Sequence, residues 1–288
     1  MTASNRPLIA SFFTIAGDVR PLEGKMISPH TLPDRAAAAA RAGFAGIGFG
    51  SDDLAHVAQH YTTREIRAIM ADHGLVHNEI EVLLDWFCDG QRRAESDQAR
   101  RFMLEWAGAL GLRHVKIGVD LMGGQWPLDQ MIESFAGLCD EAAEVGAGIC
   151  VELFPESNIA ELDTAMAIIE GAGRGNGGLC LDIWHMTRGD VDFAAIGRLP
   201  AHAIMHVELD DGPAVRTGTI LEETIERRAL PGEGAFDLDG FIRSVEATGY
   251  RGLYGVEILS DTQRRAPLAD AAQRAADTTR ASLRRALD

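Results

Sequence analysis

The segment GGLCLDIWHMTRGD, residues 177–190, joins an apolar run to two residues that can do acid–base or metal chemistry. Residues 179–181 are apolar and typical of a buried strand, and Asp182 and His185 follow where that run ends. A buried carboxylate is unfavourable unless it is paired or binds a metal. If other strands end in the same way, we expect Asp182 to be a metal ligand and His185 to point at a substrate.

Ionisable residues also end other apolar runs of the chain. Glu152 follows the run GICV, and Glu257 follows LYGV. One later run carries three ionisable residues on one face, because side chains alternate along a strand: His206, Glu208 and Asp210. Two earlier runs add Glu79, Glu81 and Lys116.

The elements that must carry these residues alternate between strand-like apolar runs and helix-like periodic segments. The first pair is a strand over residues 8–17 and a helix near 31–43, which Gly43 ends. Eight such pairs in 288 residues predict a parallel α/β sheet closed into a single (β/α)8 TIM barrel, one domain over 1–288. An open doubly wound sheet is the alternative, but no strand is followed by a Gly-x-Gly-x-x-Gly loop.

Active sites of such barrels lie at the carboxyl ends of the strands, which is where the ionisable residues fall. The acids Glu152, Asp182, Glu257 and one residue of the seventh strand would repel one another in an empty barrel mouth. A divalent cation removes that repulsion, and an oxygen-rich site favours Mn²⁺, Mg²⁺ or Co²⁺. The alternative is that each acid pairs with an Arg or Lys, or caps a helix.

Composition excludes several classes of protein. The formal net charge of −16 disfavours a nucleic acid partner. No apolar run approaches the length needed to span a bilayer, and the first residues lack the features of a signal peptide. The four cysteines form no Cys-x-x-Cys pair, so we expect a reduced, cytoplasmic protein without a membrane partner.

Five motifs occur in the order that one family leads us to expect. They are VE at the fifth strand, LDIWH at the sixth, HVELDDG at the seventh, ALPGEGAFDLDGF, and GYRGLYGVEI at the eighth. Together they resemble the xylose-isomerase-like TIM barrels of the sugar phosphate isomerase/epimerase superfamily, which includes ketose 3-epimerases, inosose dehydratases and endonuclease IV. The resemblance covers nearly the whole chain. It is specific for the superfamily but not for one reaction.

The resemblance implies one divalent metal site, with Mn²⁺ favoured and Mg²⁺ or Co²⁺ as alternatives. Glu152, Asp182 and Glu257 match three usual ligands. Family members often end the seventh strand with His-Leu-Lys-Asp, and aligning that Asp on Asp211 puts Glu208 at the fourth ligand position. His206 is then a neighbour on the same face and a reserve ligand.

The resemblance also implies the chemistry, which is removal of a proton next to a carbonyl. Glu152 and Glu257 would face each other across the metal as acid and base, and His185 would bind a substrate oxygen or transfer a proton. Arg228 matches an Arg that often contacts substrate; its alternative is an exposed loop residue. Reprotonation of the resulting enediolate gives isomerisation or epimerisation, whereas loss of a neighbouring group gives dehydration or deglycosylation.

A narrower resemblance concerns EIEVLLDWFCDG, RHVKIG, NGGLCLDIWH and VELDDG. These segments are similar to the large subunits of bacterial C-glycoside deglycosidases, which cleave 3-keto-glycosides together with a small second subunit. The expected substrate is therefore a small sugar or glycoside, and a second subunit or a homo-oligomer is an open alternative. Trp86 could pack against the sugar or its aglycone, and Lys116 is a further candidate contact. A non-catalytic partner subunit is the other alternative, and the acidic charge argues against an endonuclease.

Overall fold

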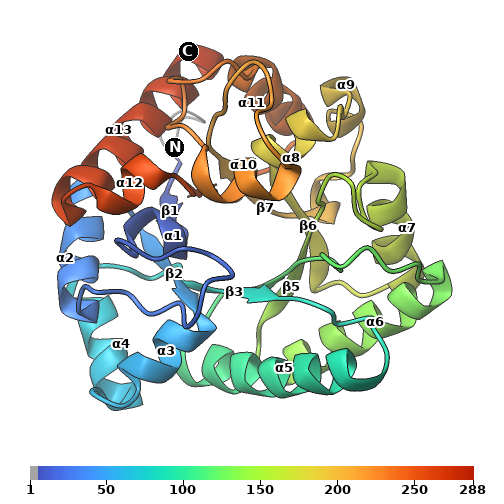
Figure 1. Ribbon diagram of the computed structural model, residues 1–288, viewed down its shortest axis with the longest axis horizontal. Coiled ribbons are helices and arrows are strands. Elements are labelled where there is room, and N and C mark those ends of the chain that lie inside the picture. The colour runs from blue at the N-terminus through green and yellow to red at the C-terminus, as the bar shows by residue number, and fades with distance from the viewer. Residues whose placement is uncertain (1–5) are drawn as a thin grey trace.

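The structure is a computed structural model that describes residues 6–288 as a closed barrel of eight parallel strands (Figure 1). Each strand pairs with the next in chain order, and the last strand pairs with the first. The strands are β1 (Leu8–Ala10), β2 (Gly46–Gly50), β3 (Glu79–Leu83), β4 (His114–Ile117), β5 (Gly148–Glu152), β6 (Gly177–Asp182), β7 (Ile204–Leu209) and β8 (Tyr254–Val256). The predicted (β/α)8 barrel is confirmed.

The longer helices form a ring around the strands (Figure 1). They are α2 (Leu32–Ala42), α4 (Thr63–Asp72), α5 (Gly90–Leu110), α6 (Leu128–Glu144), α7 (Leu162–Ala172), α11 (Leu238–Ala247) and α13 (Leu268–Leu287). The C-terminal helix α13 packs against α2 and α11, which closes the ring. None of the helices in residues 6–288 has the length and apolar composition needed to cross a bilayer.

Shorter helices lie between these elements. They are α1 (Phe12–Ile15), α3 (Ser51–Val57), α8 (Ile183–Arg188), α9 (Phe193–Ile196), η2 (Ala201–Ala203), α10 (Ile220–Glu226) and α12 (Asp261–Arg265). The helix α8 starts directly after β6, because the Asp182 side chain accepts a hydrogen bond from the backbone N–H of Trp184 at 2.7 Å and caps the first turn.

Two boundaries show how local chemistry sets the ends of elements. Gly43 ends α2 as predicted, because its φ of 82° is a left-handed conformation that favours glycine. The predicted strand over residues 8–17 is wrong beyond Ala10. Its apolar residues suit a strand or a helix, but the Thr14 hydroxyl donates to the Val256 carbonyl at 2.6 Å, and the backbone around it turns into α1.

The interior of this barrel is polar, whereas most TIM barrels fill that space with branched apolar side chains. The fully or nearly fully buried ionisable residues on its strands are Glu79, Glu81, His114, Lys116, Asp182, His206 and Glu208. Glycines make room for them. A Cβ atom at Gly48 would lie 2.9 Å from Glu81 Oε1, and one at Gly255 would lie 2.5 Å from His206 Nε2.

Asp120 organises the loop that follows β4 at the mouth. Its buried carboxylate accepts hydrogen bonds from the backbone N–H groups of Met122 and Gly124, at 2.7 and 2.8 Å, from the Trp126 indole at 2.8 Å, and from Arg92. Burial alone would raise the pKa of Asp120, but these donors lower it below its ordinary value of 3.8. As the pH falls, the carboxyl of Asp120 is therefore protonated in the unfolded chain before it is protonated in the folded protein. The ionised carboxylate thus stabilises the fold fully above pH 3.8, and this contribution is lost progressively below pH 3.8.

We expect Asp120→Asn to lower the free energy of unfolding by about 2 kcal/mol at neutral pH, because one acceptor oxygen becomes a donor that faces other donors. Urea unfolding of the wild type and the variant at neutral and acidic pH measures this. The difference in the free energy of unfolding between the two proteins should become smaller as the pH falls below 3.8. A gap that stays constant with pH would show that the charge of Asp120 is not the source of the effect.

Candidate active site

A cavity of about 160 Å³ opens at the carboxyl ends of the strands. Its lining divides by chemistry. The charged or polar part comprises Glu81, Lys116, Glu152, His185, Thr224, Arg228 and Glu257, and the apolar part includes Phe12, Phe13, Leu22, Met26, Leu84, Val119, Leu121, Phe154, Leu221, Ile225 and Leu259. The cavity therefore offers both charged groups and apolar walls to a ligand.

Four of the predicted acids converge beside this cavity. Glu152 ends β5, Asp182 ends β6, Glu208 lies on β7, and Glu257 directly follows β8. One carboxylate oxygen from each lies within 4.8 Å of the others. His206 does not belong to this group, and the choice of Glu208 as the fourth ligand stays a prediction.

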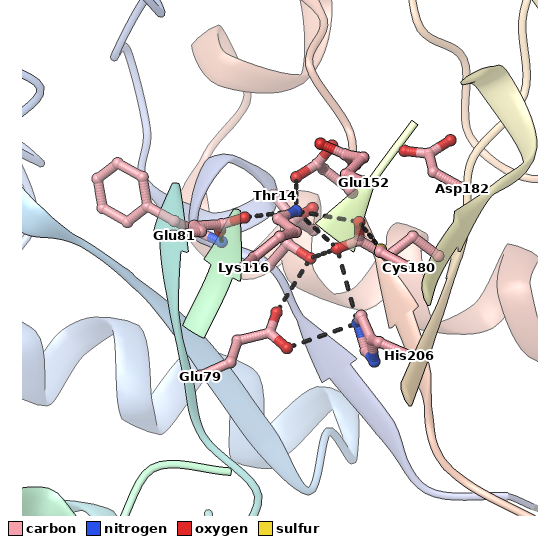
Figure 2. A network of polar contacts seen from close by, with 12 residues as sticks. Thr14, Glu79, Glu81, Lys116, Glu152, Cys180, Asp182 and His206 are labelled. Carbon is pink, nitrogen blue, oxygen red and sulfur yellow. Dashed lines mark hydrogen bonds and ion pairs between the residues drawn. The ribbon is translucent and has the colours of Figure 1, made fainter. Parts of the chain in front are cut away.

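Lys116 lies among these acids, as Figure 2 shows. Its Nζ atom is 2.6 Å from Glu81 Oε2, 2.9 Å from Glu208 Oε1 and 2.5 Å from Glu257 Oε1. Burial alone would lower the pKa of Lys116, but the carboxylates of Glu208, Glu257 and Glu81 raise it well above its usual value. Lys116 is therefore a permanent positive charge that orients three acids.

Arg228 is the second buried cation. Its Nη1 atom is 2.6 Å from both Asp182 Oδ2 and Asp210 Oδ2, and 3.1 Å from Glu257 Oε2. Its Nη2 atom lies 3.2 Å from His185 Nε2. Because its side chain is only 2 % exposed, the alternative of an exposed loop arginine is excluded.

His185 projects from α8 and lines the cavity. Its Nε2 atom is 3.5 Å from Glu152 Oε1, and burial, helped by the charge of Arg228, lowers its pKa well below the usual value. The ring is therefore neutral at physiological pH, with one nitrogen that donates and one that accepts. The structure places it where it can contact a bound molecule.

The donor set fits a divalent cation. The site gathers six carboxylates, those of Glu81, Glu152, Asp182, Glu208, Asp210 and Glu257. Among the described residues, the Lys and Arg side chains that form ion pairs with them are Lys116 and Arg228. Burial raises the pKa of Glu81, Glu152 and Asp210 well above normal, whereas the charge of Lys116 holds the pKa of Glu208 well below normal. Glu152 Oε1 is buried and has no hydrogen-bond partner. A cation among these oxygens would supply both the charge and the missing partner.

Two of the predicted substrate contacts lie away from the cavity. The Trp86 indole donates to the Gly118 carbonyl at 2.7 Å and packs edge-on against Phe87, so the structure places this ring in the core. His206 is fully buried beneath Glu208, with Nε2 3.6 Å from Glu208 Oε1. Neither side chain is among those that line the cavity, which corrects the expectation of direct contact for both.

Sequence reasoning missed the apolar walls of the cavity. Phe12 and Phe13 come from α1, Met26 comes from the loop that follows, and Leu221 and Ile225 come from α10. The only sequence signal was the Phe-Phe pair at the end of the first apolar run, which looks like the continuation of a buried strand.

Comparison with known proteins places this arrangement in a family. Residues 36–283 match the family described as xylose isomerase-like TIM barrel. A 3-dehydroshikimate dehydratase of Pseudomonas aeruginosa is 31% identical over 245 residues, which is 82% of this chain and 37% of the dehydratase. An inosose isomerase of Halalkalibacterium halodurans is 27% identical over 184 residues, 62% of this chain and 64% of the relative.

Solved structures show the same fold. The IolI protein with a bound zinc atom superposes with a TM-score of 0.84 at 19% identity, covering 97% of this chain and 98% of that one. A D-psicose 3-epimerase superposes with a TM-score of 0.69 at 17% identity, covering 94% and 96%. The present chain spans little more than a third of the dehydratases that it matches. It belongs to the xylose isomerase-like TIM barrel family.

Proposed function

We propose that this protein is a divalent-metal-dependent enzyme that removes a proton next to a carbonyl group of a keto-sugar or keto-polyol. The observation that carries the proposal is the convergence of Glu152, Asp182, Glu208 and Glu257 beside a cavity that His185 also lines. The names of the relatives, a dehydratase, an isomerase and an epimerase, agree with it. A bound divalent cation would polarise the carbonyl oxygen and stabilise the negative charge that forms on it.

Glu152 and Glu257 are the groups that we assign to proton transfer. They come from β5 and from the end of β8, three strands apart in the barrel, so they reach a bound molecule from different sides. Glu257 is held through Oε1 by Lys116 and through Oε2 by Arg228, which fixes its direction. Glu152 has one oxygen without a hydrogen-bond partner. One carboxylate can take the proton and the other can return it.

His185 and Arg228 are assigned to substrate orientation. The neutral imidazole of His185 can donate to a carbonyl oxygen or accept from a hydroxyl. Arg228 contacts His185 and Asp182 and lines the cavity, so it both fixes these groups and presents positive charge to substrate oxygens. Lys116 holds the acids and also lines the cavity.

The apolar walls favour a second candidate, a lyase that acts on a 3-keto-glycoside. The rings of Phe12 and Phe13, with Met26, Leu221 and Ile225, line the same cavity as the charged residues. A free sugar would place hydroxyl groups against these apolar surfaces, whereas a glycoside could place an apolar aglycone there. Loss of that aglycone after proton removal would give cleavage rather than isomerisation.

Deuterium uptake from D₂O tests the reaction and separates its forms. We would incubate the metal-loaded protein with 3-dehydroshikimate, inosose, D-psicose, D-tagatose and an aryl 3-keto-glycoside. Exchange next to the carbonyl that EDTA abolishes is the expected result, and the product tells isomerisation, dehydration and aglycone loss apart. Exchange that persists in EDTA would overturn the role of the cation, and no exchange or turnover of any compound by a folded, metal-loaded protein would count against the proposal.

Asp182→Asn should weaken metal binding by at least about tenfold, because it removes a charged ligand. The amide can still accept the hydrogen bond from Trp184 N–H, so α8 should keep its first turn. Titration of the chelator-stripped proteins with Mn²⁺ measures the dissociation constants. An unchanged constant would remove Asp182 from the set of ligands.

The choice of Mn²⁺ and the cytoplasmic location stay predictions from sequence. The small second subunit and the homo-oligomer also stay predictions.

A further inference from the structure

A second group of metal-binding side chains lies inside the barrel, apart from the four acids at its mouth. It consists of Glu79 at the start of β3, His114 at the start of β4, and His206 on β7. One ligand atom from each lies within 4.8 Å of the others, and all three side chains are fully buried. None of the three lines the cavity, so the proposed reaction does not use them.

The distances suit ligands around one ion. Glu79 Oε2 is 2.9 Å from His114 Nε2 and 3.5 Å from His206 Nε2. Ligand atoms about 2.1 Å from a shared cation lie roughly 3.0 to 3.4 Å apart in octahedral or tetrahedral geometry. Figure 2 shows Glu79 and His206 turned toward each other beneath Lys116.

Several buried polar atoms of these side chains have no hydrogen-bond partner within residues 6–288. Within the described residues, Glu79 Oε2 and both ring nitrogens of His114 and of His206 lack a hydrogen-bond partner of acceptable geometry. An unsatisfied buried polar atom costs about 1 to 3 kcal/mol, and here five are gathered in one place. A cation among them would satisfy the carboxylate and one nitrogen of each ring.

The protonation states agree with metal binding. Burial lowers the pKa of His114 to about 3, helped by the charge of Arg113, so its ring is neutral and keeps a free lone pair.

The neighbouring strand leaves space for the ligands. Gly255 on β8 faces His206, and any side chain there would lie 2.5 Å from Nε2 and displace the ring. The Ser11 hydroxyl lies between Glu208 of the mouth site and Glu79 of the interior group. Its hydroxyl oxygen is 2.8 Å from Glu208 Oε1 and 3.4 Å from Glu79 Oε1.

We propose that Glu79, His114 and His206 bind a second divalent cation in the barrel interior. Two imidazoles and one carboxylate suit Zn²⁺ or Co²⁺ better than Mg²⁺, so this site and the all-oxygen site at the mouth should differ in metal preference. Because the cavity does not reach it, the interior cation has a structural role. It holds His206 beneath Glu208 and so supports a ligand of the mouth site.

Anomalous diffraction from crystals of the wild-type protein equilibrated with Zn²⁺ tests the proposal. We expect a zinc peak about 2.0 to 2.2 Å from Glu79 and from both imidazoles, separate from any peak at the four mouth acids. A wild-type map with no peak among these three side chains would overturn it. A map with an interior peak and none at the mouth would instead count against the proposed function and leave this inference standing.

Two variants test whether zinc binding depends on the interior site itself or on any change in the buried part of the barrel. His114→Gln should lose one zinc per chain by elemental analysis, whereas Cys150→Ser, another buried change on the neighbouring β5, should lose none. Equal zinc in His114→Gln and the wild type would contradict the assignment. If His114→Gln does not fold, the wild-type map decides the question.

Discussion

Glu257→Gln should lower turnover about a thousandfold while the barrel stays folded. The substitution keeps the shape of the side chain but removes its negative charge and its capacity to take a proton. Glu257 lines the cavity and contacts both Lys116 and Arg228. Each of the other acids of the described site that these two cations contact pairs with only one of them. The rate of deuterium exchange, with the substrate identified as described above, measures the loss.

A matched control distinguishes a catalytic effect from a general effect of replacing a glutamate by glutamine. Glu246→Gln makes the same chemical change on α11, outside the barrel, where Glu246 accepts from Arg6 and from the Tyr254 hydroxyl. It should lower stability slightly and leave turnover unchanged. Near-wild-type activity in Glu257→Gln would refute the assignment of this residue.

Lys116→Met should destabilise the metal-free protein by about 3 to 5 kcal/mol, because it leaves buried carboxylates without their cation. The acids concerned are Glu81, Glu208 and Glu257, all within 3 Å of the ammonium group. The same change should strengthen binding of a divalent cation, since Lys116 no longer competes for Glu208 and Glu257. Added Mn²⁺ should therefore stabilise the variant more than it stabilises the wild type.

Urea unfolding in EDTA and in Mn²⁺ measures both effects. Lys116→Arg keeps the positive charge and serves as the control, with a smaller loss of stability in EDTA and no gain in metal affinity. If Mn²⁺ stabilised Lys116→Met less than the wild type, Lys116 would be needed to order the ligands, and the competition argument would be wrong.

The barrel could be predicted because its signals are local. Apolar runs and periodic segments alternate through the whole chain, and a glycine such as Gly43 ends a helix through its own backbone conformation. The acids at the strand ends followed from the fold, since the carboxyl ends of parallel strands share one face of a barrel. Alternation along β7 also explains why Glu208 and His206 point inward at different depths.

Other features depend on contacts between distant residues. Arg228 lies 46 positions from Asp182, and no local pattern shows that the loop carrying Arg228 folds back over the mouth. Trp86 follows a strand and could face either way, and it turned inward because its indole reaches the Gly118 carbonyl. The apolar walls come from α1 and α10, two short helices whose places are set by the barrel around them.

The alternative that the strand-end acids are simply paired explains part of the site. Lys116 and Arg228 do contact most of them, as that interpretation requires. It does not account for the excess of acids over these two cations or for the unpartnered oxygen of Glu152. The excess charge is what a divalent cation at the mouth would compensate.

Manganese binding to the wild type and to Glu257→Gln, both stripped with chelator and titrated side by side, tests whether the mouth acids hold that cation. Wild-type protein should bind one Mn²⁺ per chain more than the variant, or bind it at least about tenfold more tightly, because the proposed site loses one of its four carboxylates. The comparison is independent of the interior site, which both proteins share. Equal stoichiometry and equal affinity would show that these acids are paired within the protein and do not bind metal.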